Sequence, residues 1–363
     1  MYLKKLTLLN FKNYSQKEIE LSEKINCFVG KNGVGKTNIL DAIYYLSFCK
    51  SFLNPIDSQN IKHNEDLFVI QGEYDKADKV ENVYCGVKRN TKKQFKRNQK
   101  EYQKLSDHIG LFPLVIISPI DYELITGGSE ERRKFVSGII AQYNKNYLEA
   151  LIKYNKALTH RNKLLKSFAK TGKFDQVSID IWNEQLVIPG ELIFKEREKF
   201  IKKFIPIFQK YYNYISLQNE KVDLKYESDL QTDNLNNLFI NSIEKDRILQ
   251  YTTKGVHKDD LIFNISNHPI KKIGSQGQQK SYLIALKLAQ FDFINEINHY
   301  KPILLLDDIF DKLDSERVKQ IVNLVAEENF GQIFITDTNQ ERLEKILKDV
   351  PIEFKLFNLS NNK

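Results

Sequence analysis

Cysteine is scarce in this sequence, and its scarcity excludes two classes of protein. The 363 residues include only Cys27, Cys49 and Cys85. Their separations match neither the paired spacing of zinc ligands nor the dense pattern of a disulfide-bonded secreted domain. We therefore expect a reducing, cytoplasmic setting.

Long apolar runs are also missing. No apolar segment approaches the roughly 20 residues that a membrane-spanning helix needs. Residues 1–5 lead directly into an alternating strand pattern rather than into a signal peptide. These absences predict a soluble protein with no membrane partner, and the length suits roughly two domains.

Neither sign of charge dominates strongly. The sequence has 55 lysines and arginines against 47 aspartates and glutamates, which gives a formal net charge of +8. This excess is compatible with a polyanionic partner but does not require one.

A phosphate-binding loop is the most distinctive motif that is present. Residues 30–37 read GKNGVGKT and match G-x-x-x-x-G-K-[ST] at every fixed position. Glycines let backbone N–H groups turn inward around phosphate oxygens, and the helix that follows adds its positive N-terminal end. A glycine-rich turn can match by chance, but a strand pattern at 25–29 and a helix pattern at 38–46 make chance unlikely here. The motif predicts that the protein binds a nucleoside triphosphate.

The residues of this loop have distinct expected roles. We expect Lys36 to reach the β- and γ-phosphates and the Thr37 hydroxyl to bind Mg²⁺. The full set expected to bind the nucleotide is Gly30, Lys31, Asn32, Gly33, Val34, Gly35, Lys36, Thr37 and Asn38.

An apolar strand that ends in two carboxylates predicts the second half of the site. Residues 303–306 are all apolar, and Asp307 and Asp308 follow them. We expect Asp307 to join Thr37 in the Mg²⁺ shell and Asp308 to polarise the attacking water. A buried strand followed by an acidic helix cap would give the same pattern alone. A turn at 311–314 and a helix from Ser315 are expected next.

A third stretch, GSQGQQK at 274–280, precedes a predicted helix at 281–293. Ser275, Gly277 and Gln278 would form an anion site at the N-terminus of that helix, although a simple N-cap would look the same. Because the chain already has a phosphate loop, a second γ-phosphate contact so far along the sequence suggests action across a dimer. The joint order of the motifs predicts an ABC-type ATPase, in which two heads enclose two ATP molecules.

The fold class expected is α/β, an ABC-type ATPase head whose mixed sheet carries the phosphate loop, with an inserted, mainly helical second lobe. The head is expected at 1–128 and 250–363 and the helical arm at 129–249. Within the arm, leucines recur seven residues apart at 151, 158 and 165, which predicts an amphipathic helix.

A second arm helix is expected at 177–214, folding back on the first. Pro189 and Gly190 interrupt its pattern and predict a kink or a break.

A basic hairpin is expected at 88–104, where eight basic residues accompany one acid. With Phe95 and Tyr102 interleaved, it would make a positive ribbon suited to phosphates, or else a solvated sheet edge protected by lysines. The sequence leaves both interpretations open.

Beyond these patterns, the chain resembles the RecF family of bacterial recombination and repair ATPases, which are related to SMC heads. The resemblance runs nearly end to end. It is carried by residues 6–14 (LTLLNFKNY), 30–38, 118–121 (SPID), 127–135 (GGSEERRKF), 147–166, 274–280 and 304–314.

The resemblance implies an ATPase head with a helical second lobe, dimerisation driven by ATP, and binding to DNA at junctions between single-strand gaps and duplex. It also implies recombinational repair and replication restart, in which RecO- and RecR-type mediator proteins help to load the recombinase and so support the SOS response.

Several positions depart from the family pattern. The usual Ser-His-Arg after the first helix reads SFL at 51–53, and His-Arg-Asp-Asp reads HKDD at 257–260, where Lys258 keeps the charge but loses bidentate geometry. The switch histidine of ABC transporters is absent, and Asp337 lies near its place. We therefore expect a weak ATPase that uses ATP as a dimerisation switch.

DNA contacts are expected with phosphates and without base readout. The candidates are Arg132, Arg133, Lys156 and Arg161, although basic residues on helix faces are more often solvated or ion-paired. The alternatives are the nucleotide-binding subunit of an ABC transporter and the head of a chromosome-organising complex. Transporter subunits usually have the histidine switch, and a chromosome-organising head needs a longer coiled coil than this chain can hold.

Overall fold

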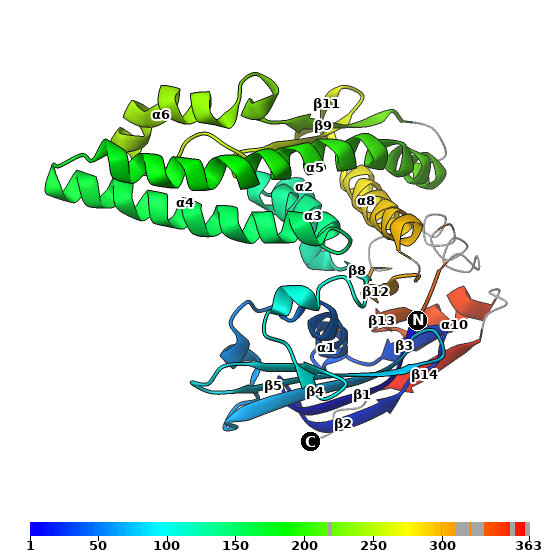
Figure 1. The fold of residues 1–363 in the computed structure, drawn as a ribbon. Helices are drawn as coiled ribbons and strands as arrows, with labels where there is room; N and C mark the ends of the chain where they lie inside the picture. Colours follow the sequence, from blue (N-terminus) through cyan, green and yellow to red (C-terminus); the bar gives the residue numbers. More distant parts are fainter. Residues whose placement is uncertain (217–219, 299, 310–319, 321–329, 349–352, 360–363) are drawn as a thin grey trace. The chain divides into compact units, whose positions relative to one another are not determined.

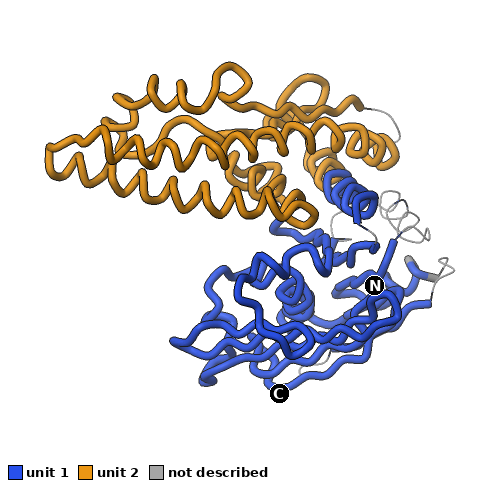
Figure 2. The backbone as a smooth tube through the Cα atoms, in the orientation of Figure 1, with its two compact units in different colours: residues 1–121, 284–363 blue, residues 122–283 orange. Residues whose placement is uncertain are grey.

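The computed structural model describes residues 1–363 except 217–219, 299, 310–319, 321–329, 349–352 and 360–363. It divides the chain into two compact units (Figure 2). Unit 1 comprises Met1–Asp121 and Ile284–Lys363, and unit 2 comprises Tyr122–Leu283. Both expected boundaries of the helical arm, at 128/129 and 249/250, thus fall inside unit 2, which also takes in the segments flanking the arm.

Unit 1 begins with an antiparallel six-stranded sheet (Figure 1). Its order is β2-β1-β4-β5-β6-β7. The strands are β1 (Tyr2–Phe11), β2 (Tyr14–Glu20), β4 (Leu67–Asp75), β5 (Val80–Lys88), β6 (Gln94–Arg97) and β7 (Lys100–Glu101). Buried and more exposed residues alternate along β4 and β5, so that one face of the sheet packs on the core.

A second, parallel sheet of unit 1 carries the nucleotide motifs. Its order is β14-β3-β13-β12-β8, and all neighbours are parallel. The strands are β3 (Ile25–Val29), β8 (Leu114–Ile117), β12 (Ile303–Asp307), β13 (Ile333–Asp337) and β14 (Phe354–Asn358). Every residue of β3, β12 and β13 is buried, which explains their apolar sequences. The expected mixed sheet is therefore two sheets, each of one kind.

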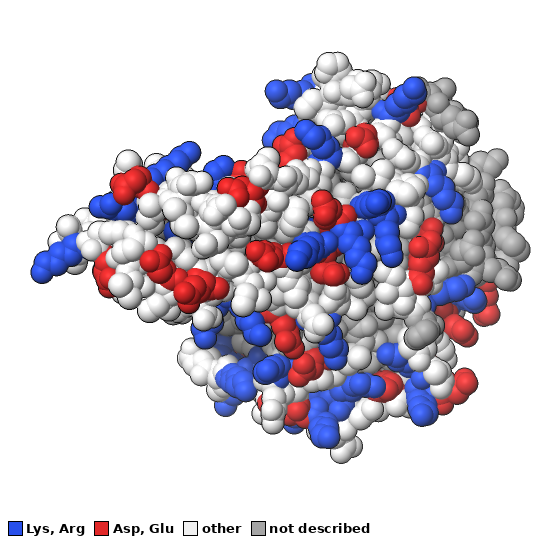
Figure 3. All heavy atoms as spheres, turned by 45° about the horizontal axis from the view of Figure 1, so that its top comes forward, with Lys and Arg blue, Asp and Glu red and all other residues white. Residues whose placement is uncertain are grey.

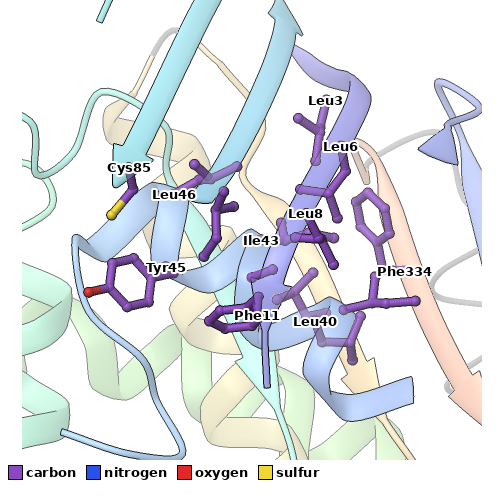
Figure 4. Close-up of a cluster of buried hydrophobic side chains, with 14 of the residues drawn as sticks. Leu3, Leu6, Leu8, Phe11, Leu40, Ile43, Tyr45, Leu46, Cys85 and Phe334 are labelled. Carbon is purple, nitrogen blue, oxygen red and sulfur yellow. The ribbon is translucent and has the colours of Figure 1, made fainter. Parts of the chain in front are cut away.

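Helix α1 (Lys36–Phe48) packs against strands of both sheets. Figure 4 shows side chains of β1, among them Leu6 and Leu8, gathered with Leu40 and Ile43 of α1 and with Phe334 of β13. Because the phosphate loop is joined directly to α1, this shared core fixes the loop against both sheets.

A buried glutamine joins the two sheets more directly. Gln332, next to β13, accepts a hydrogen bond from the Leu3 N–H and donates to the Leu3 carbonyl, both at 2.7 Å. It also donates to the Ser22 carbonyl at 2.7 Å. Its side chain thus bonds to the backbone of β1 and to the segment that leads into β3.

Unit 1 also includes most of helix α8 (Gln276–Ile297), from Ile284 on, and its other described elements are short. They are the 3₁₀ turns at Asp57–Asn60, Leu105–Asp107 and Pro119–Tyr122, the last of which ends in unit 2, and helix α10 (Gln340–Lys348). The predicted turn at 311–314 and the helix from Ser315 lie outside the described residues.

Unit 2 is mainly helical, as expected for the arm. Its helices are α2 (Glu123–Thr126), α3 (Ser129–Ile140), α4 (Lys145–Thr171), α5 (Gln176–Ser216), α6 (Leu235–Leu249), α7 (Ile270–Ile273) and the first residues of α8 (Gln276–Ile297), and a 3₁₀ turn lies at Asp229–Gln231. Strands β9 (Val222–Glu227), β10 (Asp260–Ile265) and β11 (His268–Pro269) form an antiparallel sheet in the order β11-β10-β9. In the described part of the chain, no helix is both long and apolar enough to cross a bilayer.

The two long helices, α4 and α5, lie side by side (Figure 1). Asn144 caps α4 by accepting the Tyr147 N–H, and Gly172 ends it at φ 69°. Of the kink or break expected at Pro189, the break is wrong, because α5 continues through Pro189 and through Pro206. Apolar residues at helical spacing, such as Ile179, bury the face of α5 on both sides of Pro189, and this packing outweighs the hydrogen bond that proline removes.

Candidate nucleotide-binding site

All three glycines of the phosphate loop adopt backbone conformations that side chains disfavour, and Gly30 has φ 157°. Gly33 has φ 82° and Gly35 has φ 107°. A Cβ at Gly35 would also lie 2.5 Å from Asn13 Nδ2. The loop therefore requires glycine at Gly35 both for its dihedral angles and for space.

The β1–β2 turn supports this loop through two side chains. Asn13 Nδ2 donates to the Val34 carbonyl at 3.0 Å, and the Tyr14 hydroxyl donates to the Gly35 carbonyl at 3.1 Å. Asn38 in turn donates to Asn13 Oδ1 at 2.8 Å. Burial raises the pKa of Tyr14 to about 12, which keeps its hydroxyl protonated as a donor. The bonds of Asn13 and Tyr14 to the loop carbonyls could not be predicted from the sequence, because nothing local links a strand turn to a loop some 20 residues later.

Lys36 lies across the loop. Its ammonium donates to the carbonyls of Gly30 at 2.9 Å and Lys31 at 3.3 Å, and its side chain is buried. An ammonium has three donors, so these two bonds hold it at the loop while it can still approach an anion.

Thr37 and Asp307 meet as the sequence predicts. The Thr37 hydroxyl donates to Asp307 Oδ1 at 3.0 Å, and the Thr336 hydroxyl donates to the same oxygen at 2.8 Å. Burial raises the pKa of Asp307, and the hydrogen bonds from Thr336 and Thr37 oppose that shift. A buried carboxylate beside a hydroxyl suits Mg²⁺, which prefers oxygen ligands and takes only a few from protein. The residues present therefore fit the expected cation.

Asp308 follows β12 in a strained conformation. Its φ is 46°, and its N–H donates to the Thr336 hydroxyl at 3.0 Å. Left-handed backbone is uncommon for residues other than glycine and is found at functional sites.

Asp337 lies near the place of the missing switch histidine, and its carboxylate is paired with an arginine. Arg342 Nη2 donates to both carboxylate oxygens of Asp337, at 2.9 and 2.7 Å, and the Asn339 N–H donates at 2.7 Å. The Asp337 carbonyl accepts from the Gly30 N–H at 3.3 Å. Asp337 thus connects the end of β13 to the start of the phosphate loop.

The departure at 51–53 proves to be an anchor for α1. Ser51 Oγ donates to buried Asp41 at 2.6 Å, and the Phe52 N–H donates to it at 2.8 Å. Lys12 forms an ion pair with the same carboxylate at 2.5 Å. This part of the site therefore fixes the helix rather than exposing a basic side chain.

Ser275 and Gln278 cap α8 reciprocally. Ser275 Oγ accepts the Gln278 N–H at 3.2 Å, and Gln278 Oε1 accepts the Ser275 N–H at 2.7 Å, which is a capping box. The simple N-cap that the sequence left open is thus present. Ser275 is nevertheless exposed, as a contact to a second subunit requires.

The candidate DNA-binding residues have very different surroundings. The prediction that Arg161 contacts DNA is wrong. Its side chain is fully buried and ion-paired with Asp246 at 2.7 Å, so it cannot reach DNA. Arg132 forms a bidentate pair with Asp260 at 2.7 and 2.9 Å, and Arg133 donates to the Asp259 carbonyl at 2.7 Å. The fourth candidate, the lysine at position 156, is exposed. Figure 3 shows acidic side chains lying among the basic ones on the face that it presents.

The basic hairpin does not form the surface with interleaved aromatics that the sequence allowed. Phe95 is only 1% exposed and belongs to the core of unit 1. Lys93 is paired with Asp57 at 2.8 Å and Arg97 with Glu81 at 2.5 Å.

Known proteins match this chain over nearly its whole length. Residues 2–356 match the model of the RecF/RecN/SMC N-terminal domain family. The DNA replication and repair protein RecF of Phocaeicola vulgatus is 58% identical over 359 residues, which are 98% of this chain and 96% of that protein. Its counterpart in Flavobacterium johnsoniae is 54% identical over 359 residues, covering 99% and 100%.

Solved structures agree. The recombination mediator protein RecF with ATP, of the RecFOR pathway, has a TM-score of 0.89 at 30% identity, covering 100% of this chain and 96% of that one. An Smc head domain of Pyrococcus furiosus has a TM-score of 0.57 at 16% identity, covering 99% and 94%, and shares the fold alone. The expected α/β class and SMC-like ATPase head are confirmed.

Proposed function

Because this chain belongs to the RecF family, we propose that it is an ATP-dependent DNA-binding protein of recombinational repair and replication restart. The observation that carries the proposal is the contact between the two halves of the nucleotide site, the phosphate loop and the end of β12. The Thr37 hydroxyl of the phosphate loop lies 3.0 Å from the carboxylate of Asp307, a buried residue of a strand far along the chain. The transporter and chromosome-organising alternatives are disfavoured, since a relative named RecF is 58% identical over 98% of this chain.

ATP binds in the phosphate loop. Backbone N–H groups of the loop that have no acceptor within the protein face the phosphates, and Lys36 moves from the loop carbonyls to the β- and γ-phosphates. Thr37 and Asp307 would hold Mg²⁺, which when bound supplies neutralisation of phosphate charge.

Hydrolysis is slow and uses Asp308. Its carboxylate accepts the proton of a water whose oxygen attacks the γ-phosphorus, while the bond to the β-phosphate oxygen breaks. Lys36 stabilises the charge that develops on the phosphates. Asp337 cannot replace the missing histidine, because Arg342 and the Asn339 N–H occupy its carboxylate.

ATP joins two copies of the chain. Ser275, Gly277 and Gln278 of one subunit contact the γ-phosphate held by the other, at the exposed start of α8. The positive end of a long helix suits that phosphate. In this scheme, hydrolysis of ATP lets the two subunits of the dimer separate.

DNA phosphates contact the exposed face of α4. Six lysines project from this helix, at positions 145, 153, 156, 163, 166 and 170, and all are exposed. Positions 156, 163 and 170 follow at two-turn intervals. Among the described residues, no carboxylate lies within ion-pair distance of any of the six. Lys156 is therefore one of several equivalent exposed lysines on the proposed DNA-binding face of α4. The buried Arg161 is not part of that face.

The biological setting follows from the family. The dimer acts at gap junctions with RecO- and RecR-type mediators, helps to load the recombinase and supports SOS induction. Its three cysteines are buried and unpaired, as suits the reducing cytoplasm.

The dimer is tested by light scattering at fixed protein concentration, with and without MgATP. Wild-type mass should double with ATP, and Lys36→Arg should stay monomeric. If ATP is demonstrably bound and the mass is unchanged, the role of Ser275 across subunits is wrong.

The DNA surface is tested by the salt dependence of binding to gapped duplex. Changing the lysines at 156, 163 and 170 to Glu should make the slope of log affinity against log salt shallower by about 2 to 3, since each phosphate contact contributes about 0.9. The matched control carries Glu at three exposed lysines of the hairpin, 92, 100 and 104. A larger effect in the control would move the DNA surface to the hairpin.

A further inference from the structure

One buried hydroxyl connects the two acidic residues of the ATP site. Thr336, the fourth residue of β13, is fully buried. Its Oγ1 donates to Asp307 Oδ1 at 2.8 Å and accepts the Asp308 N–H at 3.0 Å. A threonine hydroxyl can donate one hydrogen bond and accept others, so Thr336 satisfies both neighbours at once.

The strand register places Thr336 there. Thr336 is the partner of Asp307 across the parallel β12–β13 pair, so the two side chains stand next to each other at the carboxyl edge of the sheet. Threonine is β-branched and has few χ1 rotamers. Its hydroxyl is therefore held in place by the strand itself.

Hydrogen bonds fix β13 at both of its ends. Gln332, just before β13, bonds to the backbone of Leu3 and Ser22. Asp337, just after Thr336, is held by Arg342. A positioning group needs such rigid support to hold a functional side chain accurately.

Asp308 needs that support. Its φ of 46° is a left-handed conformation, which is uncommon for residues other than glycine. The hydrogen bond from its N–H to Thr336 holds this conformation, and the conformation sets the direction of its carboxylate.

We propose that Thr336 is a positioning residue for ATP hydrolysis. It orients the Asp307 carboxylate and fixes the backbone of Asp308, so that the base faces the attacking water, and it touches neither nucleotide nor water itself. The proposal rests on the proposed function, because it assigns to Asp308 the part of the base.

The test compares Thr336→Val, which keeps the shape and removes the hydroxyl, with Thr336→Ser, which keeps the hydroxyl. We expect kcat of the valine variant to fall by about 10- to 100-fold, as for other outer-shell groups that orient the residues of a site. The serine variant should have a kcat close to that of wild type. Affinity for a fluorescent ATP analogue and dimerisation with ATP should change by less than about 3-fold, because the phosphate loop is intact.

A double variant separates positioning from simple damage. If Thr336 acts through Asp308, Thr336→Val should add little to the loss caused by Asp308→Asn. Additive losses, or equal kcat values for the valine and serine variants, would overturn the inference. If wild type itself shows no ATP turnover, the proposed hydrolysis fails and this inference fails with it. Should the valine variant not fold, Thr336→Ala, which also removes the hydroxyl, gives the same comparison in the wild-type and Asp308→Asn backgrounds.

Discussion

At the scale of single residues, Arg161 shows how a basic side chain on a helix can be structural. Its guanidinium donates to Asp246 and Thr252 at 2.7 and 2.8 Å and to Asn183 at 2.8 Å. These partners come from α6, from the segment that follows it and from α5. The side chain therefore holds three parts of unit 2 together.

We expect Arg161→Met to lower the free energy of unfolding by about 3–5 kcal/mol, because it leaves the Asp246 carboxylate buried and unpaired. Urea denaturation measures this loss. The control, Lys156→Met on the exposed face of the same helix, should change stability by less than about 0.5 kcal/mol. Loss of DNA affinity in a fully stable Arg161→Met variant would contradict the structural role.

The phosphate loop was predictable from sequence and the burial of Arg161 was not, for one physical reason. The loop residues are contiguous, so that their spacing alone defines the cradle. The environment of Arg161 depends on Asp246, 85 residues away, and no local pattern reports such a contact. Thr336 was missed in the same way, since only the register of β13 on β12 brings it to Asp307.

At the scale of elements, two helices carry a glycine in their interior with opposite surroundings. A Cβ at Gly138 in α3 would meet nothing within 4 Å. A Cβ at Gly190 in α5 would lie 2.5 Å from Leu235 Cδ2 and 3.1 Å from Tyr154 Cε2. Gly190 thus marks a close approach of α5 to its neighbours.

The same substitution should therefore have opposite effects in these helices. Gly138→Ala should stabilise by about 0.5–1 kcal/mol, because alanine favours helix and there is space. Gly190→Ala should destabilise by about 1–3 kcal/mol through overpacking. Thermal unfolding of both variants provides the comparison, and equal shifts of the same sign would refute it.

The extent of α5 was predicted almost to the residue at its N-terminal end, as 177–214 against Gln176–Ser216. Its continuity was not, because intrinsic propensity gives proline a large penalty and takes no account of tertiary packing. Gly190 next to Pro189 signals a break in sequence but serves here as a packing position against Tyr154.

At the scale of the whole molecule, each unit holds a histidine, buried in unit 1 and half-buried in unit 2, that desolvation keeps neutral. His108 in unit 1 contacts the Leu46 carbonyl at 2.6 Å, and burial lowers its pKa to about 4. His257 in unit 2 contacts Tyr154 and the Thr252 carbonyl, and burial lowers its pKa to about 4 as well. Both side chains bind protons more readily in the unfolded chain.

Acid should therefore destabilise both units. Stability is complete above the unfolded pKa of about 6.5 and is lost as pH falls from there toward 4. From pH 7 to pH 5, His108 alone should cost about 2 kcal/mol by this linkage. The His108→Gln variant should have a lower free energy of unfolding than wild type at pH 7. Its free energy of unfolding should fall less between pH 7 and pH 5, as measured by urea unfolding at the two pH values. An unchanged pH dependence in the variant would contradict the assignment.

The three hydrogen bonds of Gln332 also have a mechanical consequence. Gln332 immediately precedes the fully buried strand β13 and Thr336 is its fourth residue, which puts them about 13 Å apart at roughly 3.3 Å per residue. A buried strand is stiff along its axis, so a force applied to Asp307 and Asp308 through Thr336 is transmitted to the backbone of Leu3 and Ser22. The antiparallel sheet is thereby joined by hydrogen bonds and one strand to the two acidic residues of the candidate site.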